Sequence, residues 1–103
     1  MDEKPQSSVN FTIVPEDAPD VPRIYANFCA IQNSPFDFSL TFCEVMPVSE
    51  KQILEAQETR AVRAPVRAKL VVPVQMIPGL IGALQENFRL YQQSFGPPTG
   101  PLN

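Results

Sequence analysis

The residues that could carry chemistry are few and widely spaced. Histidine is absent from the 103 residues, which removes the commonest general base and metal ligand. The acids before the last predicted helix fall mainly in a proline-rich segment, residues 15–22, and in a polar interior segment, residues 46–61, where carboxylates lack the burial that acid–base catalysis needs. Two separated cysteines without histidines match no structural zinc pattern. The sequence therefore predicts a non-enzymatic protein with no metal and no cofactor.

Cys29 and Cys43 lie one on each strand of a predicted hairpin. A tight register places them on opposite faces or offsets them by about four residues, roughly 14 Å, whereas a disulfide needs Cα atoms within about 7 Å. We expect two free thiols, which fit a cytoplasmic protein. No basic segment followed by an apolar run is present, so neither a signal peptide nor a membrane span is expected.

Arg63, Arg67 and Lys69 form a basic stripe along the third predicted strand. The stripe could meet an acidic protein segment or a phosphate backbone, or it could lie on a solvated face with Asp37 or Glu44 as a cross-strand partner. The formal net charge is −3 and the pI is about 4.8, which argues against nucleic acid as the partner.

The elements that would position these residues follow from hydrophobic periodicity. Strands are predicted over residues 23–32, 36–45 and 62–72, with a turn at 33–35. In the second strand the apolar residues alternate strictly with polar ones: Phe36, Phe38, Leu40 and Phe42. Residues 46–61 hold few apolar side chains, so a solvated loop is favoured over a short helix capped by Ser49 and Gln52.

A long C-terminal helix ends the domain. Apolar residues recur at helical spacing from Ile77 to Phe95, and Gly96 followed by two prolines stops the helix. The prediction is an α+β fold: an antiparallel sheet with the first strand at the edge or in the centre, and the helix packed across one face. A Pro- and acid-rich arm (1–21), one domain (22–96) and a mobile tail (97–103) complete the chain.

Two stretches suggest partners. The segment Val9–Val14 is β-prone and could add an edge strand to its own sheet or to a neighbouring subunit. Asn27 is unexpected in an apolar strand, and a buried amide must be hydrogen-bonded, within the fold or across a subunit interface. The candidate partner or oligomer surface comprises Tyr25, Asn27, Cys29, Ile31, Arg63, Arg67 and Lys69.

Residues 22–96 resemble the small bacterial and archaeal proteins grouped as the domain-of-unknown-function family numbered 3467. The resemblance rests on Tyr25, Ala26 and Asn27, then Ser34, Pro35, Asp37 and Phe38, then Tyr91, Phe95 and Gly96. The family has no established activity, and the two cysteines depart from its pattern. The element order also resembles the SecB-like fold, whose subunits pair to hold unfolded chains or partner proteins.

These observations predict that the protein is a small homo-oligomeric adaptor or scaffold module. It binds protein, and its first partner is a second copy of itself. A dimer or higher oligomer is expected because one small core removes only about 60% of the unfolded surface. Two alternatives stay open: a SecB-like chaperone that holds extended polypeptide, and a nucleic-acid-associated protein that uses the basic stripe. The further partner expected is another protein or an extended peptide. Binding to a membrane is not expected.

Overall fold

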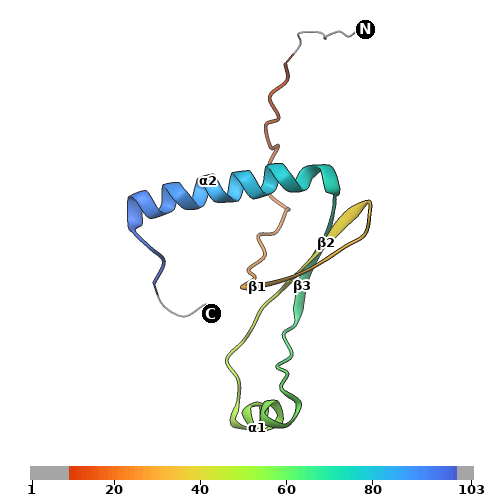
Figure 1. The fold of residues 1–103 in the computed structure, drawn as a ribbon, viewed down its shortest axis with the longest axis vertical. Coiled ribbons are helices and arrows are strands. Elements are labelled where there is room, and N and C mark those ends of the chain that lie inside the picture. Colours follow the sequence, from red (N-terminus) through yellow and green to blue (C-terminus); the bar gives the residue numbers. More distant parts are fainter. Residues whose placement is uncertain (1–9, 100–103) are drawn as a thin grey trace.

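The computed structural model describes residues 10–99. Its elements are β1 (Phe28–Asn33), β2 (Asp37–Cys43), α1 (Glu50–Thr59), β3 (Val66–Pro73), a 3-10 helix η1 (Val74–Met76) and α2 (Ile77–Phe95). The three strands form an antiparallel sheet in the order β1-β2-β3, and the long helix follows the last strand (Figure 1). The predicted α+β class is confirmed, with the first strand at the edge.

A compact side-chain turn closes the β1–β2 hairpin. The Ser34 hydroxyl oxygen accepts hydrogen bonds from the backbone N–H groups of Phe36 and Asp37, each at 3.1 Å. The same hydroxyl donates to Asp37 Oδ1 at 3.0 Å, and the Ser34 N–H donates to the Asp37 carbonyl at 2.9 Å. Short polar side chains favour turns because they can bond the nearby backbone in this way. Asp37 therefore has a defined structural role in the turn.

Strand register divides the sheet into two chemically different faces. On one face, which we call the Leu70 face, Leu40 pairs with Ile31 on one side and with Leu70 on the other. Phe38 and Phe42 lie on the same face, because side chains two residues apart on a strand point the same way. On the opposite face, Thr41 pairs with Lys69 and Ser39 with Val71. We call this the Lys69 face.

The buried core is very small. Within residues 10–99, the only apolar side chains with less than about a tenth of their surface exposed are Leu40, Cys43 and Val72. The accessible surface is 9306 Å², whereas a compact monomer of 11.5 kDa exposes about 5,800 Å². A single copy of the chain therefore leaves an unusual amount of apolar surface in water.

Helix α2 does not complete that core. It begins with Pro78 in its first turn, where the missing N–H costs little, and it ends at Gly96, whose φ of 76° suits glycine. In Figure 1 it runs crosswise to the strands, and no residue of this helix is buried. The expected packing of the helix across one sheet face is thus not achieved within one chain.

The segment that was expected to be a loop contains α1. The Ser49 hydroxyl accepts from the Gln52 N–H at 3.2 Å, and Gln52 Oε1 accepts from the Ser49 N–H at 2.8 Å, which completes a capping box. None of its residues is buried, and the helix lies at the end of two extended segments away from the sheet (Figure 1). The favoured loop was wrong, and local capping explains why.

Both outer strands begin later than predicted. β1 begins at Phe28: the Asn27 N–H still donates to the Cys43 carbonyl, but beyond this bond the Asn27 side chain, not the backbone, pairs with Val45. β3 begins at Val66 because Pro65 has no N–H to donate, although its carbonyl accepts from the Glu44 N–H at 3.0 Å. A bulge then shifts the register, so that Cys43 pairs with Val66 and Phe42 with Ala68.

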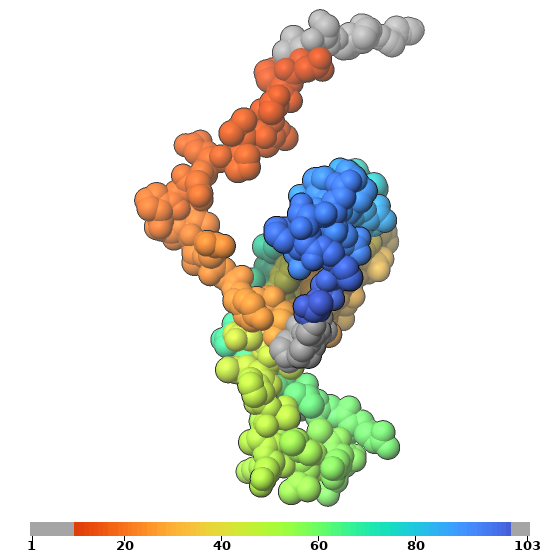
Figure 2. Space-filling view, turned by 90° about the vertical axis from the view of Figure 1, so that its left-hand side faces the viewer, coloured from red at the N-terminus to blue at the C-terminus, as the bar shows by residue number. Residues whose placement is uncertain are grey.

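The described part of the N-terminal arm, residues 10–21, forms no strand of its own sheet. Residues 10–14, the described part of the predicted edge strand, have no regular secondary structure, and Val9 lies outside the described residues. Figure 2 shows the arm, coloured red to orange, extending away from the sheet and from α2. The rest of the predicted arm, residues 1–9, and the last residues of the predicted tail, 100–103, also lie outside the described part.

Candidate interaction surface

The largest uncovered apolar feature is one side of α2. Its members recur at three- and four-residue spacing and each exposes at least two fifths of its surface: Ile81, Leu84, Phe88, Tyr91 and Phe95. We call this set the helix stripe. The Tyr91 ring lies 6.4 Å from that of Phe88 and 5.1 Å from that of Phe95, measured between centroids. A row of neighbouring aromatic rings exposed along one side of a helix is typical of a protein-binding surface, although the apolar Leu90 is also exposed outside this row.

Polar residues occupy the other side of α2. Arg89 donates from Nε to Glu86 Oε1 at 3.1 Å and from Nη2 to Oε2 at 2.6 Å. These hydrogen bonds lower the pKa of the Glu86 carboxyl below its usual value and raise that of Arg89. The pair is exposed, so it marks the solvent side of the helix.

The Leu70 face of the sheet is also incompletely covered. Ile31 is 59% exposed and Leu70 is 50% exposed, although both flank the buried Leu40. At one end of this face a shallow pocket of about 270 Å³ is lined by Pro22, Ile24, Ala26, Phe42, Ala68 and Leu70. The segment before β1 therefore covers only a corner of the apolar face.

Asn27 makes its hydrogen bonds within the fold. Its Oδ1 accepts from the Val45 N–H at 2.7 Å, and its Nδ2 donates to the Val45 carbonyl at 3.1 Å. The Asn27 backbone N–H also donates to the Cys43 carbonyl at 3.0 Å. The side-chain amide thus imitates a peptide group and extends the β1–β2 ladder by one step. The prediction that this amide is hydrogen-bonded within the fold is confirmed, and its role in fixing the register stays a prediction.

The basic stripe does not form one uniform surface. Arg67 lies at the bulge and donates from Nε to Glu44 Oε1 at 3.1 Å, as the solvated alternative predicted. Lys69 is exposed opposite Thr41 on the Lys69 face, and Arg63 is exposed before β3 begins. Because a carboxylate neutralises Arg67, the geometry gives no added support to a phosphate-binding role.

The other predicted surface residues are distributed over different sites. Tyr25 is 65% exposed in the irregular segment before β1. Cys29 pairs with Phe42, and Cys43 pairs with Phe28, so the two thiols lie on opposite faces. Both are free, as predicted. Cys29 and Ile31 share the Leu70 face, whereas Lys69 belongs to the other face. The seven predicted residues therefore do not form one patch.

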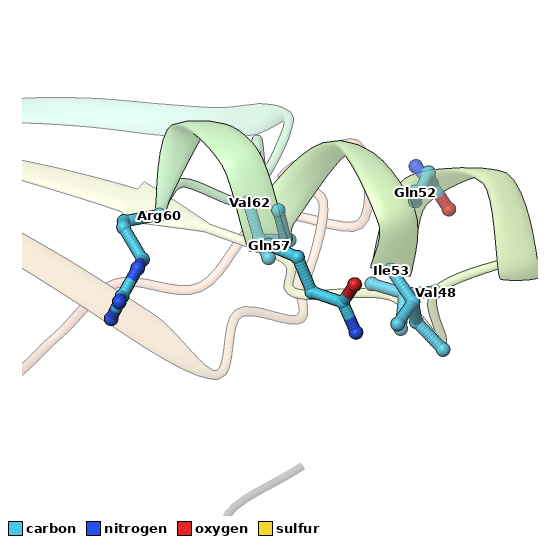
Figure 3. A pocket seen from close by; sticks show the side chains of 7 residues that line it. Val48, Gln52, Ile53, Gln57, Arg60 and Val62 are labelled. Atoms are coloured by element: carbon cyan, nitrogen blue, oxygen red, sulfur yellow. The ribbon is translucent and has the colours of Figure 1, made fainter.

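A pocket lies beside α1. It has a volume of about 440 Å³ and is lined by Val48, Gln52, Ile53, Ala56, Gln57, Arg60 and Val62 (Figure 3). The only charged side chain in that lining is Arg60, the helix C-cap, which adopts a φ of 61°. No carboxylate, cysteine or hydroxyl lines this pocket, so its walls offer neither a nucleophile nor a general acid. Its geometry supports contact rather than chemistry.

Two kinds of site are absent from residues 10–99. No group of three or more histidine, cysteine, aspartate or glutamate side chains is placed to hold a metal ion there. No helix in this range has the length and apolar composition needed to cross a membrane.

The helix stripe was absent from the predicted partner surface. Its spacing was visible in the sequence and was assigned to packing within the domain, because an apolar helical face is usually buried by its own chain. Only the arrangement in space reveals that the helix contributes no buried residue. The signal was therefore present, but the sequence did not specify what covers it.

Comparisons with known proteins agree with the motifs. No curated protein and no solved structure matches the chain. A family model, described as protein of unknown function (DUF3467), matches residues 1–97. The residues that carry the likeness have structural roles here: Asn27 in the ladder, Ser34 and Asp37 in the turn, and Gly96 at the end of α2. The chain therefore belongs to the DUF3467 family.

Proposed function

We propose that this chain is a non-enzymatic module that binds protein and that assembles first with itself, as a homodimer. The observation that carries the proposal is that α2 has a continuous apolar stripe and no buried residue. An exposed apolar stripe of this kind on a soluble domain often marks a site of protein–protein contact. A second copy supplies an identical stripe, and isologous pairing of identical surfaces is the commonest arrangement in oligomers.

The energetics favour covering this surface. Leu84 is 62% exposed and Phe95 is 74% exposed, so each retains more than half of its burial free energy for an interface. Full burial of such a side chain contributes about 1.5–3 kcal/mol. The three buried side chains of one copy supply too small a core for an independent domain of this length. Association is therefore expected to stabilise the fold as well as cover the helix.

The setting of the protein is also part of the proposal. Two free thiols on opposite sheet faces fit a reducing compartment, and we place the protein in the cytoplasm on this basis.

Sedimentation equilibrium on the full chain tests the assembly. We expect a dimer at micromolar concentration, and we expect Leu84→Asp to raise the dissociation constant more than about tenfold, because a carboxylate would have to be desolvated in the stripe. Gln85→Asp is the matched control: it introduces the same charge one residue on, about 100° around the helix. A monomeric wild-type chain, or equal effects of both substitutions, would contradict the proposal.

A second function, a SecB-like chaperone, is favoured by the exposed Leu70 face and by the outer edges of β1 and β3. An extended apolar peptide could add to such an edge and place alternate side chains against that face. The wild-type chain would then suppress aggregation of an unrelated unfolded protein at near-stoichiometric ratio. Absence of suppression at a tenfold molar excess would remove this function and leave the adaptor proposal intact.

A further inference from the structure

The N-terminal arm contains a segment with strand-like composition whose apolar side chains are exposed to solvent. We define the arm strand as residues 10–14, Asn-Phe-Thr-Ile-Val. Phe11 is 87% exposed, Ile13 is 92% exposed and Val14 is 75% exposed. Aromatic and β-branched residues are the types that favour strands, and Pro15 ends the segment because it cannot donate to a ladder. The segment therefore has the composition of a β-strand but is not paired with any strand in the described structure.

The outer edge of β3 is the complementary surface. In the described sheet β3 is paired only with β2, so its other edge presents N–H and C=O groups to solvent. The edge is also apolar, since Leu70 is 50% exposed and Val71 is 66% exposed. The two outer strands differ in charge. β3 carries Arg67 and Lys69 beside its apolar residues, whereas β1 (Phe28–Asn33) includes no charged side chain.

Charge distinguishes the two edges and sets the direction. Glu16 and Asp17 follow the arm strand, whereas Arg63 precedes β3 and Arg67, which already pairs with Glu44, lies at its start. In an antiparallel pairing the end of the arm strand meets the start of β3, so the acids lie beside the bases. A parallel pairing would place the acids beside residues 74–76, where no basic side chain is present.

The two sheet faces set the side-chain alternation. Phe11 and Ile13 point to one face of a strand, and Thr12 and Val14 point to the other. The Leu70 face is apolar, and the Lys69 face carries Thr41, Ser39 and Asp37. Phe11 and Ile13 must therefore continue the Leu70 face, with Thr12 on the Lys69 face. The opposite register would place both apolar side chains beside Lys69, Thr41 and Ser39, with Val71 as their large apolar neighbour on β3.

From these complementary features we infer that the arm strand adds antiparallel to the outer edge of β3 in a second copy of the chain, as an exchanged fourth strand. The inference rests on the proposed self-association and names one of its contacts. Pro22, Ile24 and Ala26 lie over the Leu70 face as far as Ala68 and Leu70 of their own β3, but residues 10–14 do not go on to pair with the outer edge of that strand. The arm instead extends away from that sheet (Figure 2).

Two substitutions in the arm strand of the full chain provide the test. Ile13→Asp and Thr12→Asp introduce the same charge at adjacent residues that point to opposite faces. Neither residue is in an element of its own copy's fold, so both variants are expected to fold. We expect Ile13→Asp to raise the dimer dissociation constant at least tenfold, and Thr12→Asp to change it less than threefold, because Lys69 lies on that face.

A disulfide-trapping experiment identifies which copy receives the arm. The full chain carrying both Ile13→Cys and Leu70→Cys is treated with an added oxidant, beside the wild-type chain with its native thiols. We expect covalently linked dimers that depend on both introduced cysteines. A link formed only within single chains would show that the arm folds back on its own sheet and would overturn the inference.

The outcomes separate this inference from the proposed function. If the wild-type chain dimerises and Leu84→Asp weakens the dimer while Ile13→Asp and Thr12→Asp behave alike, the arm exchange is wrong and self-association through α2 stands. If Ile13→Asp weakens the dimer and Leu84→Asp does not, the arm exchange stands and the role of the helix stripe fails.

Discussion

Leu40→Ala is expected to lower the free energy of unfolding by about 2–5 kcal/mol, the range for truncating a buried leucine. Leu40 is 8% exposed at the centre of β2, where it is paired with Ile31 on one side and Leu70 on the other. Among the three buried apolar residues it has the largest side chain, so its removal leaves a cavity between both neighbouring strands. Chemical denaturation of the full chain, followed by circular dichroism, measures this loss.

Leu70→Ala is the matched control because it removes the same atoms from the cross-strand partner. Leu70 is half exposed in one copy, so its truncation should cost about half as much in dilute solution. If a second copy covers this side chain, the cost should increase with protein concentration, whereas the cost of Leu40→Ala should be similar at every concentration. Equal losses for both variants at low concentration would show that the core is not centred on Leu40.

Asn27→Ala is expected to destabilise the sheet by about 2 kcal/mol, because two hydrogen bonds to the Val45 backbone are lost and each contributes about 1 kcal/mol. The distances of 2.7 Å and 3.1 Å indicate that both bonds are well formed. The loss should also loosen the β1–β2 register next to Cys43. Thermal unfolding measures the stability, and amide hydrogen exchange at Val45 reports the local change.

Asn27→Asp separates the two hydrogen bonds. The carboxylate can still accept from the Val45 N–H but cannot donate to the Val45 carbonyl, so an intermediate loss is expected. Gln32→Ala, at an exposed position of β1, should change stability by less than about 0.5 kcal/mol. If Asn27→Ala behaved like Gln32→Ala, the ladder role of the amide would be wrong.

Much of the sheet could be predicted from residue patterning. The strict alternation around Leu40 identified β2, because a period of two is produced only by an extended chain with one buried face. The beginnings of β1 and β3 were placed too early, since a run of apolar residues does not show where backbone pairing starts. Asn27 and Pro65 set those limits through individual hydrogen bonds. Helix α1 was missed because its capping box outweighs its few apolar residues.

The candidate surface was less predictable than the fold. The fold depends on contacts between neighbouring segments, and these leave periodic signals in the sequence. An interaction surface depends on which of the periodic apolar faces remain uncovered after folding. No local sequence pattern contains that information. The helix stripe was therefore assigned to the core, while Lys69 and Cys29 were grouped although they lie on opposite faces. The bulge at Arg67 has no signal in the sequence other than the nearby proline.

The position of α1 has a consequence for how this protein can vary. The helix contributes no buried residue, and its ends are capped by its own residues and the Arg60 backbone. The sheet does not depend on its length or its side chains. Insertions, deletions or new surface chemistry between β2 and β3 can accumulate there without disturbing the strand ladder. The segment is thus free to diversify in length and surface chemistry while the sheet and α2 stay unchanged.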